Sequence, residues 1–352
     1  MAAGKTPVPA AGLVQAIAAI LAETGVEQSA ATIVAQDLVS ADVEGVASHG
    51  AMLVPLYVEK LQAGAVSTAS QGTVVSEQGC VTVLDAMDVM GQLTARQAVA
   101  IALNSAKAHG MGAVAVRNAF HFGAAGPYAR MIADGGAVGI VMSNTRPLMP
   151  APGGAEPVTG NNPVAIAAPS AGAFAPEVDM ALSAAAMGKI RNAAAAGQSI
   201  PAGWAADKDG SPTQDPEAAI AGMLLPAAGP KGFGLAFLID LLAGGLSGGR
   251  IGAEVAGLYA DRATPYRCSN LFLAIDVGHF LPAEEFKARA QSETDRVAAS
   301  RKAPGVDRVF APGEMAYVAR ATSDGMLQLP TPTWDALVKT GASLGLNVPA
   351  LI

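Results

Sequence analysis

Two of the chain's four histidines have neighbours that suit chemistry. His49 stands in the run Ser48-His49-Gly50 between two expected helices, and His121 follows an expected strand in the segment 117–123. Both have small or polar neighbours, and nearby glycines would let a ligand approach the backbone. Because a histidine pKa lies near neutral pH, either side chain is a candidate acid or base in proton transfer. The alternative for each is an ordinary structural histidine.

Two glycine-rich segments are candidates for binding an anion. The segment 159–163 reads Thr-Gly-Asn-Asn-Pro and offers backbone N–H groups together with amide side chains. The segment 229–234 places Lys231 among glycines at the start of an apolar helix, where the helix N-terminus favours negative charge. The alternative for both segments is an ordinary turn, with a solvated lysine in the second.

Patterns of several other site classes are missing from the sequence. No GxxxxGK[ST] loop, no GxGxxG after a strand and no HExxH occurs, so we expect no metal and no standard Rossmann nucleotide site. Cys80 and Cys268 match no CxxC pattern and are expected to be small buried apolar side chains.

The spacing of apolar residues predicts an α/β chain. Ser29 is expected to cap the second helix, and the apolar run 138–142 is expected to form a strand buried on both faces. Helices are expected over 11–24, from Ser29 onward, and over 52–61, 91–109, 128–133, 231–246, 283–301 and 333–344, and strands over 72–75, 80–84, 112–116, 137–142, 163–168, 177–182 and 271–276.

The composition narrows the class of protein. Of 352 residues 51% are hydrophobic, and the net charge is −7, which argues against a nucleic-acid partner because phosphate binding needs a basic surface. The mean hydropathy of +0.36 comes from alanine, valine and leucine spread along the chain, and no apolar run of 18 residues indicates a membrane span. No signal peptide is visible, so a cytoplasmic location is expected.

Six motifs occur in an order that resembles the malate/L-lactate dehydrogenase type-2 family. The resemblance spans about residues 10–320. The family also contains ureidoglycolate and sulfolactate dehydrogenases, diketogulonate reductase and reductases of the cyclic imino acids Δ1-piperideine- and Δ1-pyrroline-2-carboxylate. The motifs are Ser48-His49-Gly50, Asn118-Ala-Phe-His121-Phe-Gly123, Gly160-Asn-Asn162-Pro163, Val178-Asp179-Met180-Ala181 with Gly188-Lys189-Ile190, Ile200-Pro201 through Asp215-Pro216, and Leu225-Pro226 through Gly234.

The resemblance implies a mixed-sheet α/β fold that is not a Rossmann fold, with an added helical domain. Residues 1–70 together with 281–352 are expected to form the helical domain that carries the Ser-His-Gly motif. Residues 71–280 are expected to form the mixed-sheet core with the nucleotide and catalytic sites. The resemblance also implies NAD or NADP as cofactor, a small-molecule substrate and a homodimer with active sites near the subunit boundary.

Roles follow from the resemblance position by position. His121 matches the catalytic histidine, which would exchange a proton with the substrate oxygen while hydride passes to or from the nicotinamide. Ser48 and His49 match the pair that contacts the substrate, and both are counted with the catalytic residues. The positions that match nucleotide contacts are Thr145, Gly160, Asn162, Asp179, Met180, Ala181, Lys231, Gly313 and Glu314. For Asp179 the cap of a strand end stays open as an alternative.

One departure from the family concerns the substrate carboxylate. The family usually reads Ser-His-Gly-x-x-Arg, but this chain has Leu53 at the place of that arginine. Leucine cannot replace a bidentate arginine–carboxylate contact. Either the substrate of this chain has no carboxylate beside Leu53, or another cation binds that carboxylate. Arg146, beside Thr145, is a candidate replacement. The alternative is a surface arginine or one that binds a cofactor phosphate.

The sequence therefore predicts an NAD(P)-dependent oxidoreductase that acts on a small 2-oxo or 2-hydroxy acid. The first alternative is reduction of a cyclic imino acid. The small residues Ala124, Ala125 and Gly126 argue against this alternative, because imino-acid members of the family carry a bulky Leu-Trp there. The second alternative is a catalytically silent binding or assembly protein on the same fold, which the missing arginine keeps open and the two histidines speak against.

Overall fold

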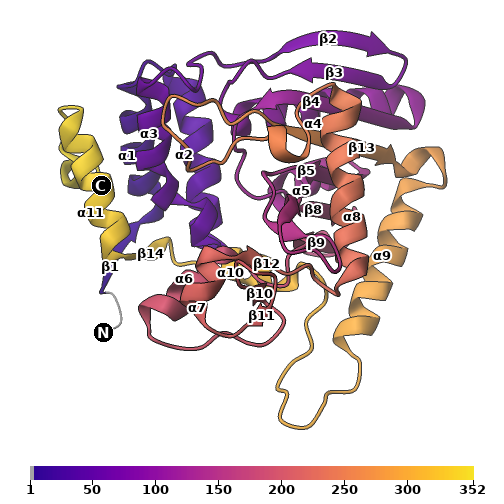
Figure 1. Cartoon of the computed structure of the whole chain (residues 1–352). Coiled ribbons are helices and arrows are strands. Elements are labelled where there is room, and N and C mark those ends of the chain that lie inside the picture. The colour runs from indigo at the N-terminus through magenta and orange to yellow at the C-terminus, as the bar shows by residue number, and fades with distance from the viewer. Residues whose placement is uncertain (1–3) are drawn as a thin grey trace.

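A seven-stranded mixed sheet lies at the centre of the computed structural model, which describes residues 4–352 (Figure 1). Its strands lie in the order β2 (Thr73–Gln78), β3 (Val81–Asp85), β4 (Met111–Ala119), β13 (Cys268–Asp276), β5 (Ala137–Ser143), β8 (Val164–Ala167) and β9 (Glu177–Met180). Only β3 and β4 pair in parallel, and the other neighbours are antiparallel. The predicted mixed-sheet fold is confirmed, and its antiparallel pairs distinguish it from a parallel Rossmann sheet.

Two helices cover one face of this sheet. α4 (Gly91–His109) packs on β4 and β13, and α5 (Gly126–Asp134) packs on β5 and β8. Glycines in the strands permit this close approach. A Cβ at Gly139 would lie 2.6 Å from the Ala129 carbonyl oxygen of α5. On the opposite face the strands present apolar side chains that α8 (Pro230–Asp240) covers only in part.

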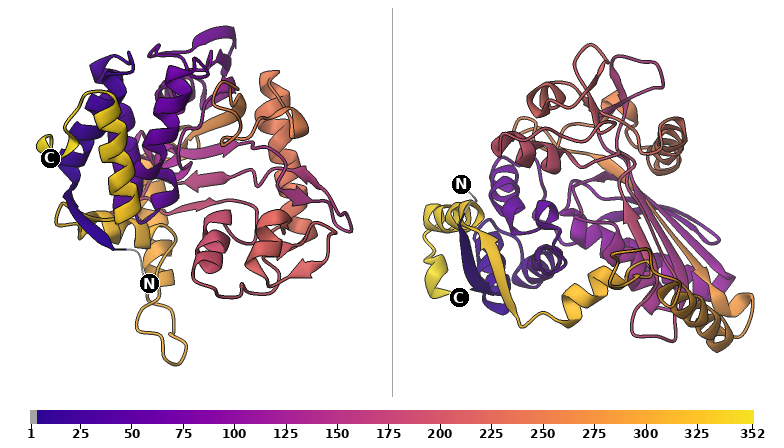
Figure 2. Two further views of the ribbon diagram at one scale, coloured as in Figure 1. Left: turned by 60° about the vertical axis from the view of Figure 1, so that its left-hand side comes forward. Right: turned by 90° about the horizontal axis from the view of Figure 1, so that it is seen from below.

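A helical layer packs beside the sheet and contains both ends of the chain (Figure 2). It consists of α1 (Ala10–Ala22), α2 (Gln28–Val43), α3 (Val54–Gln62) and α11 (Thr331–Ser343). β1 (Lys5–Pro9) pairs antiparallel with β14 (Met326–Pro330), which ties the two ends together. One buried apolar cluster runs from these helices to the sheet, so the layers share a core. The expected division at residues 70 and 281 stays a prediction.

The rest of the chain forms short elements around the sheet. Two short sheets, with strand orders β6–β7 and β11–β10–β12, and two helices lie within residues 149–224, part of which the sequence suggested only as a loop. The elements are β6 (Met149–Pro150), β7 (Pro157–Thr159), α6 (Met187–Ala195), β10 (Ala205–Ala206), β11 (Pro212–Thr213), α7 (Pro216–Ala221), β12 (Met223–Leu224), α9 (Ala283–Ala298), α10 (Glu314–Ala321) and the helical turns η1 (Ala47–His49), η2 (Ala51–Leu53), η3 (Leu241–Gly245), η4 (Gly252–Glu254), η5 (Val277–His279) and η6 (Val348–Ala350).

Each helix and strand that the apolar spacing predicted is present, with shifted ends, and two details were wrong. The second helix begins at Gln28, and the Ser29 hydroxyl bonds to Glu27 instead of capping the helix. β5 alternates between buried and half-buried residues, so only its α5 face is fully covered. The helix predicted over 231–246 is confirmed: α8 passes directly into the π-helical turn η3 at Leu241. Within residues 4–352 no helix combines the length and apolarity that a bilayer crossing requires.

Candidate functional site

The fold brings together His49 and His121, which are 72 residues apart in the sequence. Their imidazole rings stack with centroids 5.6 Å apart and an interplanar angle of 22°. η1, which follows α2, carries His49, and the segment after β4 carries His121. The two histidines that the sequence singled out therefore share one site at the edge between the helical layer and the sheet.

A turn at the end of β4 fixes the position of His121. Asn118 has a left-handed φ of +51°, and its side-chain amide donates two hydrogen bonds of 3.1 Å to the Asp85 carboxylate. Gly91, at the start of α4, lies so close that an added Cβ would be 2.5 Å from the His121 carbonyl oxygen. Only glycine lets α4 begin against this backbone, so the site is built into the packing of α4 on β4.

Asp42 of α2 fixes the backbone directly after the Ser-His-Gly motif. The Asp42 carboxylate accepts a hydrogen bond of 2.7 Å from the Ala51 backbone N–H. A Cβ at Gly50 would lie 2.3 Å from the same carboxylate, which explains the glycine. Ser48 is exposed, and its hydroxyl lies 2.9 Å from His49 Nδ1. The serine hydroxyl and the imidazole thus form one polar pair at the site.

Tyr57 of α3 is a site residue that the sequence reading missed. Its hydroxyl lies 2.8 Å from His121 Nδ1 and 3.4 Å from the His121 carbonyl oxygen, and it accepts a bond of 3.3 Å from the Gln92 side-chain amide. One arrangement satisfies all three contacts: Nδ1–H donates to the phenol, and the phenol donates to the carbonyl. Nε2 is then the basic nitrogen that is available to a substrate.

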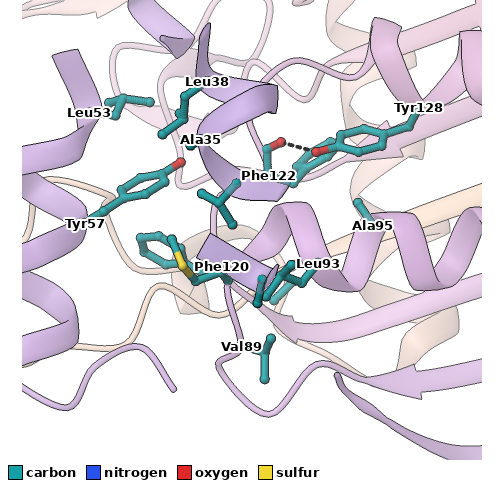
Figure 3. Packing of buried hydrophobic residues seen from close by; sticks show 14 of the residues in the cluster. Ala35, Leu38, Leu53, Tyr57, Val89, Leu93, Ala95, Phe120, Phe122 and Tyr128 are labelled. Atoms are coloured by element: carbon teal, nitrogen blue, oxygen red, sulfur yellow. Dashed lines mark hydrogen bonds between the residues drawn. The ribbon is translucent and has the colours of Figure 1, made fainter. Parts of the chain in front are cut away.

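Two weak signals could have indicated Tyr57. The chain has only five tyrosines, and this one lies eight positions after His49 on the helix that follows the motif. The side chain is completely buried, and its ring packs edge-on against Phe120 with centroids 4.9 Å apart (Figure 3). A tyrosine on the apolar face of a helix is usually a core residue. The sequence alone therefore could not show whether Tyr57 only packs in the core or also contacts the catalytic candidate His121.

Burial controls the protonation of the site. It lowers the pKa of His121 to about 3, and the neighbouring His49 adds to this effect. Burial also lowers the pKa of His49, and it raises that of the Tyr57 hydroxyl. Both imidazoles are therefore neutral near pH 7, which leaves a base ready to accept a proton.

The loop 255–267 closes another side of the site. Tyr266 packs edge-on against His121, with ring centroids 6.4 Å apart. Lys60 of α3 is fully buried, and its ammonium donates to the Asp261 and Thr264 carbonyl oxygens at 3.3 and 3.1 Å. This buried cation holds the loop against α3 and is engaged by backbone oxygens, so it is not available to a ligand.

Three predicted cofactor positions, Thr145, Gly160 and Asn162, lie together. The Asn162 side-chain oxygen accepts from the Thr145 backbone N–H at 2.9 Å, and the Thr145 hydroxyl donates to Asn161 at 3.0 Å. A Cβ at Gly160 would come within 2.3 Å of the Thr145 hydroxyl. The structure thus brings this group into one compact turn, with Arg146 exposed beside it.

The other predicted cofactor positions divide into two groups. Asp179 accepts a bond of 2.8 Å from the backbone N–H of Gly126, the first residue of α5, so it caps the helix that follows the His121 segment. Met180 stays 43% exposed, and Ala181 follows it. Gly313 packs against Glu177, and the buried Glu314 carboxylate binds Arg308 and the Ala311 N–H.

A cleft beside Lys231 has room for part of a dinucleotide. Its volume is about 490 Å³, within the range of small-molecule sites. Gly229 and Pro230, directly before Lys231, line one wall, and Gly153, Gly154 and Gly210 contribute others. The glycines expose backbone, and the lysine at the start of α8 adds the cation that a phosphate needs. These residues fit a phosphate-bearing cofactor.

Leu53 lies apart from any open surface. Its side chain is 1% exposed and belongs to the core beside Leu38 of α2 (Figure 3). The position at which the family carries a cation is thus filled by an apolar side chain that packs inward.

Comparison with known proteins identifies a family whose sequences match almost the whole chain. The family model described as malate/L-lactate dehydrogenase matches residues 8–338. A malate dehydrogenase from Pyrococcus abyssi is 35% identical over 94% of this chain and 92% of its own length. The relatives include the ureidoglycolate dehydrogenase (NAD(+)) of Escherichia coli K12, 35% identical over 84% of each chain, and the (2R)-3-sulfolactate dehydrogenase (NADP(+)) of Chromohalobacter salexigens, 33% identical over 91% of this chain and 93% of its own.

Solved structures agree with the sequence matches. The sulfolactate dehydrogenase from Methanocaldococcus jannaschii superposes with a TM-score of 0.93 over 98% of this chain and 99% of its own, at 33% identity. The Δ1-piperideine-2-carboxylate reductase from Pseudomonas syringae superposes with a TM-score of 0.85 over 95% and 99%, at 28% identity. Both the sequence and the fold therefore show that this chain belongs to the malate/L-lactate dehydrogenase family of oxidoreductases.

Proposed function

We propose that the protein transfers hydride between the nicotinamide of NAD or NADP and a small 2-oxo or 2-hydroxy acid, with His121 as the acid and base. The observation that supports this most directly is the contact of His121 Nδ1 with the Tyr57 hydroxyl at 2.8 Å, which leaves Nε2 free. The lowered pKa of His121 keeps that nitrogen unprotonated near pH 7, so its lone pair is free to face the proton of a substrate hydroxyl.

The other site residues have roles in binding. When bound, the nicotinamide accepts or supplies the hydride. Ser48 and His49 are proposed to contact the substrate beside His121, because their stacked and hydrogen-bonded side chains lie on the same edge. The proposed cofactor residues are Thr145, Gly160, Asn162, Asp179, Met180, Ala181, Lys231, Gly313 and Glu314. Glu314 would act through the turn it stabilises, since its carboxylate already has two partners.

Reduction of a cyclic imino acid is the second candidate function. The likeness to a structure described as a Δ1-piperideine-2-carboxylate reductase favours it, since both reactions need hydride transfer and one proton. The small side chains of Ala124, Ala125 and Gly126 after His121 favour the open-chain substrate, as we expect from the family resemblance. The silent binding protein stays the third alternative.

We also propose that the protein is a homodimer that uses the open face of the sheet. At the β8–β9 edge of that face, Ile166 and Val178 are apolar and each 40% exposed although they lie in the sheet. Large contiguous apolar patches mark interaction sites, and a second copy offers the same surface. The cytoplasmic location stays a prediction from the sequence.

Oxidation of reduced cofactor tests the reaction. Purified protein is given NADH or NADPH and, in turn, pyruvate, oxaloacetate, sulfopyruvate, diketogulonate or the two cyclic imino acids, while nicotinamide absorbance is followed. We expect turnover with one of the oxo acids, and His121→Ala should lower kcat by about 100- to 10,000-fold. Turnover only with the imino acids would establish the second candidate. No turnover and no cofactor binding in calorimetry would leave only the silent protein.

A further inference from the structure

We propose that Arg146 binds the carboxylate of the substrate. This inference rests on the proposed function, in which the substrate is a 2-oxo or 2-hydroxy acid. Such an acid carries a carboxylate beside the reacting carbon, and a buried or half-buried carboxylate needs a cation or several hydrogen-bond donors. Leu53, in the core, supplies neither.

Arg146 borders the histidine pair through Tyr266. Burial raises the pKa of Tyr266 well above its usual value, and the positive charge of Arg146 opposes part of that rise. The same tyrosine ring packs against His121 at 6.4 Å between centroids. Arg146 also lies against the loop 255–267, where an added Cβ at Gly257 would be 3.2 Å from Arg146 Cδ and 3.5 Å from Nε.

The Arg146 guanidinium is a cation with no carboxylate partner at this place among the described residues. Within residues 4–352 its only polar contact is a long bond of 3.4 Å from a terminal nitrogen to the Pro147 carbonyl oxygen, and it has no carboxylate partner. Two neighbouring cations are engaged: Lys60 by two carbonyl oxygens and Arg267 by the Asp88 carboxylate at 3.0 Å, whereas Arg262 of the loop 255–267 is exposed. The planar fork of the guanidinium leaves four N–H donors without a partner in the described part of the chain, and this geometry matches a carboxylate.

A buried network fixes the backbone that carries Arg146. The Asn144 side chain donates to the Asp240 carboxylate at 2.7 Å and accepts from the Ser269 backbone N–H at 2.7 Å. Asp240 is the residue directly before the π-helical turn η3. Its carboxylate also accepts a hydrogen bond of 2.9 Å from the Gly252 backbone N–H. The Thr145 backbone N–H is bonded to Asn162 as well, so the backbone before Arg146 is held in place while the Arg146 side chain stays exposed.

Substitution of Arg146 tests the proposal with the acid and amide forms of one substrate. For the best 2-hydroxy acid of the panel, Arg146→Ala should raise KM by about 10- to 100-fold, the range for a lost hydrogen bond to a charged group. kcat/KM for the corresponding 2-hydroxy amide, which has no carboxylate, should change less than twofold. Arg146→Lys should recover part of the loss for the acid. Arg289→Ala, on the exposed face of α9, is the matched control.

A second variant tests the position of the Arg146 side chain without removing its charge. Gly257→Ala would press a methyl group against Arg146 and should raise KM for the acid while the cofactor Kd stays unchanged. Equal losses for acid and amide, or an unchanged KM in Arg146→Ala, would overturn the proposal while the dehydrogenase function stands. A weaker cofactor Kd in Arg146→Ala would also overturn it, because the arginine would then bind the nucleotide. A wild-type protein without turnover would instead refute the proposed function.

Discussion

At the scale of single residues, the contact of Tyr57 with His121 makes a prediction about pH. Because burial lowers the pKa of His121 from 6.5 to about 3, the base is neutral far below the ordinary histidine pKa. Oxidation needs that neutral form, so kcat/KM for the hydroxy acid should not fall as pH decreases from about 8 to about 5. The measurement is kcat/KM across this range, and an acid limb centred near 6.5 would contradict it.

Tyr57→Phe separates positioning from packing at the same contact. The variant keeps the ring against Phe120 but loses the hydroxyl at His121 Nδ1, so the imidazole is no longer held in one orientation and tautomer. We expect kcat to fall about tenfold with little change in KM, and the pH profile of kcat/KM to shift. Tyr128→Phe, whose hydroxyl donates to the Phe122 carbonyl oxygen, removes a comparable buried hydroxyl and should leave the pH profile in place.

At the scale of elements, a charge network joins α2, α5, β9 and α10. Arg130 of α5 lies 2.5 Å from Glu44, which follows α2, and 2.6 Å from Glu177 of β9, while Arg320 of α10 contacts Glu44 at 2.9 Å. The Glu44 and Glu177 side chains are 8% and 6% exposed. The network therefore holds the element before His49 against the strand that carries Asp179.

Removal of Arg130 tests this network. Arg130→Ala leaves two nearly buried carboxylates with less compensation and should lower the free energy of unfolding by about 3 kcal/mol, measured in urea. Burial already raises the pKa of Glu177, and loss of the cation would raise it further. A raised pKa means that the folded state binds the extra proton, so the deficit should shrink as pH falls. Arg289→Ala, which breaks an exposed pair, should change stability by less than about 0.5 kcal/mol.

The elements also show what the sequence could predict. The helices and strands of the core were predictable because apolar spacing follows burial, as in α4 and β13. β1 was not, because a five-residue strand with two prolines at the chain end gives no alternating signal and pairs with β14 more than 300 residues away. Tyr57 and Lys60 were missed for a related reason: their roles depend on contacts made by segments distant in sequence.

At the scale of the whole molecule, the uncovered face of the sheet is the main unexplained surface. The register places Ile140 opposite Ile166 and Ile166 opposite Val178, so their side chains lie on the face away from α5. Ile166 and Val178 are each 40% exposed, and α8, which covers the neighbouring end of this face, itself presents Leu238 at 53%. A sheet interior that is apolar and open to water is costly for an isolated chain.

The dimer prediction follows from this face. A stable interface buries about 800 Å² on each partner, and exposed Ile166 and Val178 together with exposed Leu238 of α8 are the apolar surface that we propose for it. Ile166→Asp would place a charge in the middle of that surface and should convert the dimer to monomers in sedimentation velocity, because the buried carboxylate would have no partner. Met326→Asp is the matched control: this residue is 42% exposed on β14, in the helical layer, and should leave the dimer intact. If wild type sediments as a monomer, or if Ile166→Asp still sediments as a dimer, the open face has another use, and the association of subunits must be sought elsewhere on the molecule.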